Sequence, residues 1–76
     1  MSDLKYKYIG TPPTKLIEEC AELIHALCKA ERFGWENFHP DRPNETNREL
    51  VRAEMKDVEG ALERMQRYLE KRRRAP

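Results

Sequence analysis

The sequence predicts an all-α protein in which two long antiparallel helices form a helical hairpin. Apolar residues recur at helical spacing in two segments, residues 12–33 and 46–73. A loop with two prolines and one glycine, residues 34–45, separates these segments. A two-helix hairpin leaves part of each apolar face uncovered. We therefore expect self-association into a four-helix bundle, as a homo-dimer or homo-tetramer.

Composition favours one small domain, residues 1–76. A core of this size is marginal and often needs a metal, disulfides or self-association. The formal net charge of only +1 argues against a chain that binds nucleic acid along its whole length. No apolar run approaches the roughly 18 residues of a membrane span. The opening MSDLKYKYIG lacks the apolar core of a signal peptide, so we expect a cytoplasmic protein.

The first helix is expected over residues 12–33, after an extended arm at residues 1–11. Thr11-Pro12-Pro13-Thr14 is a helix-entry signal, because threonine caps and proline is tolerated in the first turn. Gly34 ends the helix, as glycine commonly does. The predicted apolar side consists of Leu16, Cys20, Leu23, Ile24 and Leu27.

The second helix is expected over residues 46–73, with a basic C-terminal end. Thr46 and Glu49 fit a capping box, in which the side chain of each residue accepts a hydrogen bond from the backbone N–H of the other. Apolar residues then repeat at alternating steps of four and three, as in an interhelical seam. That seam consists of Val51, Met55, Val58, Leu62, Met65 and Leu69.

The two cysteines, Cys20 and Cys28, cannot form a disulfide within one helix. They are eight residues apart, about 12 Å along the axis, whereas bridged Cα atoms lie within about 7 Å. We expect both to pack in the core.

Acidic residues repeat at a spacing of three on both predicted helices. Glu19 and Glu22 form one pair, and Glu54 and Asp57 form the other. If the helices pack antiparallel, the pairs can meet across the interface, and their mutual repulsion would be relieved by a divalent cation. Oxygen ligands favour Mg²⁺ or Mn²⁺, often together with substrate phosphates. The alternative is that these glutamates form a solvated helix face.

At these residues the chain resembles the MazG-type family of all-α nucleoside triphosphate pyrophosphohydrolases. The family pattern Glu-Glu-x-x-Glu, then Glu-x-x-Asp, reads here as Glu18 to Glu22 and Glu54 to Asp57. The surrounding segments KLIEECAELIHALCKAERFG and ELVRAEMKDVEGALERM are similar to small, often phage-encoded members, which implies the host cytoplasm. The resemblance covers roughly residues 12–69.

The resemblance implies hydrolysis of a nucleoside triphosphate to the monophosphate and pyrophosphate. A metal-activated water would attack the α-phosphate. Carried onto this chain, Glu19, Glu22, Glu54 and Asp57 would hold Mg²⁺, with Mn²⁺ as a substitute. The catalytic residues would be Glu18 and Glu19, with Glu18 in the outer shell or orienting the attacking water.

Several other residues are candidates for contact with the substrate. Lys15, Lys56 and Arg64, together with Arg52, lie on the same helices as the carboxylates and could neutralise phosphates. Each is also interpretable as a surface charge. Trp35 could stack on a nucleotide base, or it could cap the open end of the hairpin together with Phe38.

A second function class rests on the basic C-terminal end, Lys71, Arg72, Arg73 and Arg74. In this alternative the chain is a small non-enzymatic helical interaction or nucleic-acid-binding module, and the basic end contacts phosphates. Cations also complement the dipole at the C-terminus of any helix, which gives a purely structural interpretation.

Overall fold

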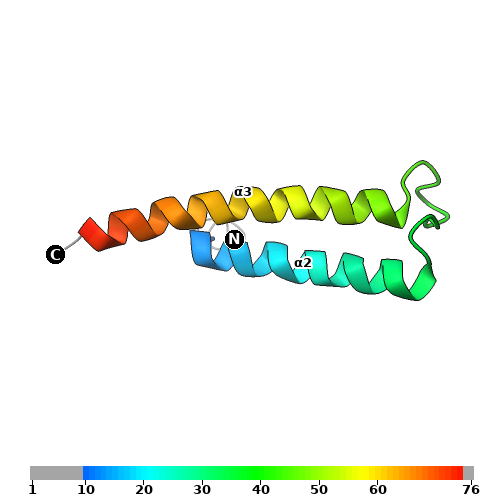
Figure 1. Ribbon diagram of the computed structural model, residues 1–76, viewed down its shortest axis with the longest axis horizontal. Helices are drawn as coiled ribbons and strands as arrows, with labels where there is room; N and C mark the ends of the chain where they lie inside the picture. Colours follow the sequence, from blue (N-terminus) through cyan, green and yellow to red (C-terminus); the bar gives the residue numbers. More distant parts are fainter. Residues whose placement is uncertain (1–9, 75–76) are drawn as a thin grey trace, which may run out of the picture.

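Two long α-helices packed antiparallel make up the fold (Figure 1). The computed structural model describes residues 10–74. Helix α2 spans Pro12–Phe33 and helix α3 spans Asn47–Arg74. Between residues 10 and 74 there is no strand, only an isolated antiparallel bridge between Phe38 and Thr46. The prediction of an all-α hairpin is confirmed, while most of the predicted arm, residues 1–9, lies outside the described residues.

The ends of α2 are set by short-range contacts. Thr11 has extended backbone (φ −74°, ψ 162°), and its Oγ1 accepts a hydrogen bond from the Thr14 N–H at 3.4 Å. Pro12 fits the first helical position because no intrahelical donor is needed there. At the other end Gly34 has φ +107°, a conformation that costs side-chain-bearing residues energy, and its N–H donates to the Ala30 carbonyl at 2.8 Å.

The start of α3 is fixed by the predicted capping box. The Thr46 N–H donates to Glu49 Oε1 at 3.0 Å, and the Glu49 N–H donates to Thr46 Oγ1 at 3.2 Å. Asn47 is buried, and its Nδ2 donates to the Gly34 carbonyl at 2.8 Å. The end of α2 is thereby tied to the beginning of α3, which closes the hairpin.

The helix–helix interface is built around small side chains. Ala30, Val51 and Ala61 are the buried apolar residues of the described chain, and none of its large side chains is fully buried. Within the predicted seam, Val51, Val58 and Met65 face inward, since they are buried or half-buried. Such an interface lets two helices approach closely but buries little apolar surface.

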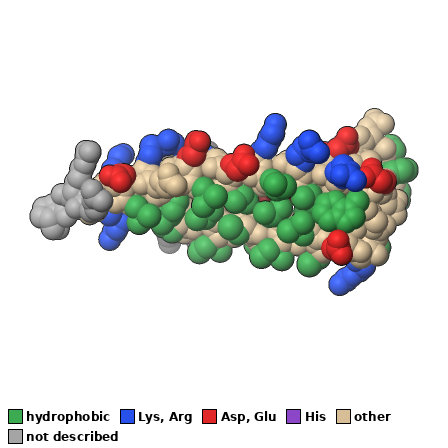
Figure 2. All heavy atoms as spheres, in the orientation of Figure 1, with side chains coloured by type: hydrophobic (Ala, Val, Ile, Leu, Met, Phe, Trp, Pro, Cys, Tyr) green, Lys and Arg blue, Asp and Glu red, His purple; other side chains and the backbone are tan. Residues whose placement is uncertain are grey.

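The other half of the predicted seam is open to solvent. We call Met55, Leu62 and Leu69 the outer row; their exposed fractions are 49%, 45% and 52%. Ile17, Ile24 and Leu27 on α2 are also exposed. Figure 2 shows apolar side chains gathered along one face of the molecule, over both helices. A hairpin of this kind has more apolar surface than one pair of helices can cover.

The cysteines divide between the two sides of α2. Cys20 is half-buried, whereas Cys28 is exposed, so the prediction that both pack in the core is wrong for Cys28. The reason is rotation: Ala30, two residues on, is the position that faces α3. Neither described helix contains a stretch both long and apolar enough to cross a membrane.

Candidate metal centre

Two glutamates occupy positions where α2 and α3 meet. Glu54 lies on the inward side of α3, one turn from Val51 and one from Val58, and is half-buried. The Glu19 side chain on α2 is only 14% exposed. One oxygen of each, Glu19 Oε1 and Glu54 Oε1, is buried without a hydrogen-bond partner among the described residues. Unsatisfied buried oxygens are costly, so these two positions require a physical reason.

Glu22 completes a group of three carboxylates. Each of Glu19, Glu22 and Glu54 offers one oxygen, and these oxygens all lie within 4.8 Å of one another. We call these three residues the carboxylate cluster. Glu22 is exposed, so the cluster opens to solvent on its side. Asp57, one turn further along α3, is exposed and lies outside this group of three.

Burial and neighbouring charges raise the pKa of the Glu54 carboxyl above its usual value. Desolvation is the main cause, followed by the charges of Glu22, Asp57 and Glu19, and by a side-chain hydrogen bond with Glu22. Each of these favours the neutral form of Glu54. Asp57 therefore acts on the cluster through its charge, although its oxygens are not among the three.

Lys15 is the cation closest to the cluster among the described ion pairs. Its Nζ lies 3.6 Å from Glu19 Oε2 and 3.9 Å from Glu18 Oε1. The Glu18 side chain is 57% exposed and stays outside the interface. Lys15 thus compensates the outward-facing oxygen of Glu19, while Glu19 Oε1 remains unpaired inside.

The donor set of the carboxylate cluster fits a hard divalent cation. All three ligands are carboxylate oxygens, which Mg²⁺ and Mn²⁺ prefer over the nitrogen and sulfur ligands of zinc. A cation would satisfy the two orphaned oxygens of Glu19 and Glu54 and remove the mutual repulsion of the group. Lys15 alone cannot do so, because it contacts the other oxygen of Glu19.

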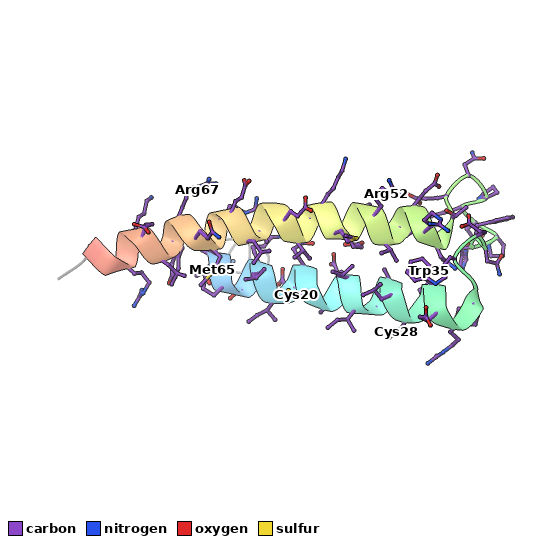
Figure 3. The ribbon with its side chains drawn as sticks, in the orientation of Figure 1. Cys20, Cys28, Trp35, Arg52, Met65 and Arg67 are labelled. Atoms are coloured by element: carbon purple, nitrogen blue, oxygen red, sulfur yellow. The ribbon has the colours of Figure 1, made fainter. Side chains whose placement is uncertain are left out.

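Trp35, predicted to contact substrate, lies at the loop end of the hairpin (Figure 3). Its Nε1 donates to Glu31 Oε2 at 3.1 Å, and its carbonyl accepts from the Arg48 N–H at 2.8 Å. The indole lines a hollow of about 340 Å³ together with Arg48, Val51, Arg52 and Met55. Trp35 therefore helps to close the hairpin, which is one of the two predicted alternatives, and its contact with a substrate stays a prediction.

The two remaining predicted substrate residues, Lys56 and Arg64, are exposed on α3. Arg64 lines a second hollow, of about 320 Å³, between the start of α2 and the last turns of α3. We call this hollow the basic pocket; it is lined by Pro12, Arg64, Arg67, Tyr68 and Lys71. Sequence reasoning missed Arg67 and Tyr68, although Arg64, Tyr68 and Lys71 follow Asp57 at helical spacing.

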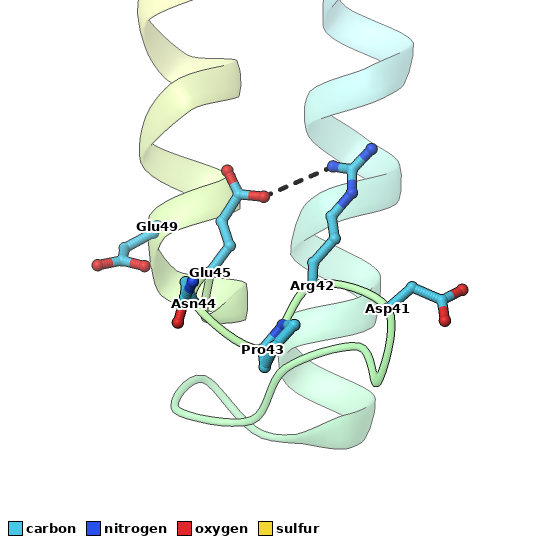
Figure 4. A pocket seen from close by; sticks show the side chains of 6 residues that line it. All are labelled: Asp41, Arg42, Pro43, Asn44, Glu45 and Glu49. Carbon is cyan, nitrogen blue, oxygen red and sulfur yellow. Dashed lines mark ion pairs between the residues drawn. The ribbon is translucent and has the colours of Figure 1, made fainter.

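A third hollow, of about 510 Å³, lies in the interhelical loop (Figure 4). It is bordered by an ion pair between Arg42 Nη1 and Glu45 Oε1 at 3.5 Å. All of its lining residues are on the loop or the first turn of α3: Asp41, Arg42, Pro43, Asn44, Glu45 and Glu49. None belongs to the carboxylate cluster, and we assign this hollow no role.

Comparison with known proteins gives no matching family model, no matching curated protein and no matching solved structure.

Proposed function

We propose that the protein is a cytoplasmic, magnesium-dependent nucleoside triphosphate pyrophosphohydrolase of the MazG type. The observation that carries this proposal is the pair of orphaned oxygens, Glu19 Oε1 and Glu54 Oε1, buried where the helices meet and grouped with Glu22. Burial of an unpaired carboxylate oxygen is costly, and a ligand bound between the helices would offset that cost. A divalent cation coordinated only by oxygen is the simplest such ligand.

Glu19, Glu22 and Glu54 would hold the metal, with Asp57 joining when substrate binds. Bound Mg²⁺ supplies charge for the phosphates and lowers the pKa of water. Glu18 lies at the exposed edge, on the same turn as Glu19, and would orient the attacking water. Lys15, held by Glu18 and Glu19, would fix these carboxylates and neutralise a phosphate oxygen. Trp35 would offer a ring on which a base can stack, and Arg52, which lines the same hollow, would offer a charge to a phosphate.

Self-association into a four-helix bundle is part of the proposal. The outer row on α3 and the exposed Ile17, Ile24 and Leu27 on α2 would pack against the same residues of a second copy. Burying the open apolar face would also reduce solvent access to the carboxylate cluster. Low dielectric strengthens the interactions of metal and phosphate at such a site.

The test is hydrolysis of each common ribo- and deoxyribonucleoside triphosphate, followed by chromatography of the nucleotide products. We expect the monophosphate and pyrophosphate from at least one substrate, with dependence on Mg²⁺ or Mn²⁺. Glu22→Gln and Asp57→Asn should each abolish turnover, whereas Glu63→Gln, an exposed carboxylate elsewhere on α3, should not. Release of a nucleoside diphosphate and inorganic phosphate would contradict the proposal. Equal rates of hydrolysis in Glu22→Gln and wild type would also contradict it.

A further inference from the structure

The basic residues of the chain are concentrated at the end of α3. Six of the 15 Lys and Arg residues lie between Arg64 and Arg74, with one acidic residue, Glu70, among them. Every other acidic residue precedes Arg64. The net charge of +1 therefore combines a strongly basic helix end with an acidic remainder. A local positive potential attracts anions even where the net charge of the chain is small.

Four cations of this segment are exposed and unpaired. We call Arg64, Arg67, Lys71 and Arg72 the cationic group. Within residues 10–72 the ion pairs involve other cations, and no carboxylate lies at ion-pair distance from the cationic group. Glu63 and Glu70, the acidic residues nearest in sequence, are therefore not partners of these cations.

Three of these cations form one stripe along α3. Arg64, Arg67 and Lys71 follow one another at steps of three and four, a spacing that places neighbours side by side on a helix. Like charges at this spacing repel each other and destabilise the helix that carries them. A polyanion bound along the stripe would relieve this repulsion at all three positions.

The dipole of α3 does not account for the stripe. A helix C-terminus carries the equivalent of about half an elementary negative charge, and its effect falls off within the last turn. Because α3 ends at Arg74, Arg64 and Arg67 lie ten and seven residues before its end, about two to three turns. Lys71 and Arg72 alone would be enough to complement the dipole.

The end of α3 extends beyond α2. Helix α2 begins at Pro12, which lines the same hollow as Tyr68 and Lys71, whereas α3 continues to Arg74. Figure 1 shows α3 projecting past the start of α2, and Figure 3 marks Arg67 on this part of α3. A large ligand can therefore lie along the stripe without displacing α2.

Arg72 is held in place beside the stripe. Its guanidinium carbon lies 5.5 Å from the centre of the Tyr68 ring, and its Nη1 donates to Tyr68 Oη at 3.4 Å. Tyr68 is half-buried and has Arg72 over its ring, so it does not offer a free aromatic face of the kind on which single-strand binders stack bases. This surface therefore presents charges for phosphates rather than a ring for bases.

The carboxylate cluster is too far away to cancel this charge. Arg64 follows Glu54 by ten residues, about 15 Å along the helix axis. The screening length at physiological ionic strength is about 8 Å. A polyanion at the end of α3 is therefore influenced mainly by the cationic group.

We propose that the cationic group binds the phosphate backbone of double-stranded DNA, without reading its sequence. A duplex fits better than a single strand because its charge density is higher, with one negative charge per about 1.7 Å of axis against about 3.4 Å for one strand. Arginine, which supplies three of the four cations, can hold two phosphate oxygens at once. The inference does not rest on the proposed function, since it concerns a different surface and a different partner.

The test is a fluorescence anisotropy titration of the full chain into a short labelled DNA duplex of arbitrary sequence, with a metal chelator present. Four phosphate contacts predict that the logarithm of the binding constant falls with the logarithm of the salt concentration at a slope of about −3.6. A fourfold rise in salt should therefore weaken binding about a hundredfold. The double variant Arg67→Gln/Lys71→Gln should bind at least about tenfold more weakly than wild type, with a slope of about −1.8.

Arg32→Gln/Lys56→Gln is the matched control, because it also removes one exposed arginine and one exposed lysine but leaves the cationic group intact. It lowers the net charge by the same amount, so a general effect of charge would appear in both double variants. We expect the control to change affinity less than about threefold and to keep the slope of wild type. Circular dichroism of both double variants should match wild type, since the replaced side chains are exposed.

No binding to the duplex, or equal affinity in Arg67→Gln/Lys71→Gln and its control, would overturn the inference. Tighter binding of a single strand of the same length would also overturn it and would indicate a surface for bases. Binding to vesicles that contain phosphatidylserine, but not to the duplex, would identify a lipid surface instead. Hydrolysis of a triphosphate without DNA binding would refute this inference alone, and DNA binding without hydrolysis would refute only the proposed function.

Discussion

Replacement of Glu54 by glutamine should stabilise the metal-free protein and abolish its response to Mg²⁺. Glutamine keeps the shape of the side chain, removes one negative charge from the cluster and offers an N–H₂ group to neighbouring carboxylates. Two unit charges 4.8 Å apart repel by about 0.9 kcal/mol in water, and by about 3.5 kcal/mol at an effective dielectric constant of about 20. The half-buried cluster lies between these limits. We expect a stabilisation of about 1–3 kcal/mol at pH 7.

The assay is a thermal melt with a chelator, and then with Mg²⁺ or Mn²⁺ at constant ionic strength. For a chain of this size each kcal/mol moves the midpoint by about 4–8 °C. Wild type should gain stability saturably with metal, by about 2.7 kcal/mol at 100 times the dissociation constant. Glu54→Gln should melt higher than wild type in chelator and show no gain with metal.

Glu63→Gln serves as the control, because it removes one exposed negative charge from the same helix without touching the cluster. It should keep the metal response of wild type. A metal-free Glu54→Gln protein that melts below wild type would refute the electrostatic reasoning. An equal metal response in Glu54→Gln and wild type would refute the assignment of the ligands.

Three further predictions concern pH, the loop and assembly. Folding raises the pKa of the Glu54 carboxyl, so the protonated form of Glu54 is favoured in the folded state. The resulting stabilisation is fully present below about pH 4.5 and is lost as the pH rises through the folded pKa. In melts with chelator, Glu54→Gln should therefore be more stable than wild type at pH 7, and this difference should shrink at pH 4. Asn47→Ala removes the shorter of two hydrogen bonds to the Gly34 carbonyl, leaving the one from the Asn37 N–H at 3.3 Å, and should cost about 1 kcal/mol by chemical denaturation, whereas the exposed Asn44→Ala should cost little. Leu62→Glu places a charge in the outer row and should reduce the mass seen by sedimentation to that of one chain, with helicity retained; a native-size assembly in this variant would rule out the outer row as the interface.

The sequence was sufficient for the features that depend on near neighbours. The ends of α2 follow from Thr11, Pro12 and Gly34, and the start of α3 follows from the Thr46–Glu49 capping box. These signals act over three or four residues, so no knowledge of the fold is needed to interpret them. The i, i+3 spacing of the glutamates likewise places each pair on one side of its own helix.

The tertiary structure decided how the two helices are rotated and shifted against each other. Sequence periodicity predicted one seam, but rotation divides it into an inward half and the outer row, which is exposed. Rotation also sends Cys28 to the surface.

Within the candidate site, the shift between the helices groups Glu54 with Glu19 and Glu22 and leaves Asp57 at the edge. It also places Pro12 of α2 and Tyr68 of α3 on the lining of one hollow, the basic pocket. These outcomes depend on contacts between residues far apart in the chain, such as Asn47 with Gly34. The helical period fixes which residues share a face of one helix. It does not fix which face meets the partner helix, or how far the two helices are shifted along their axes.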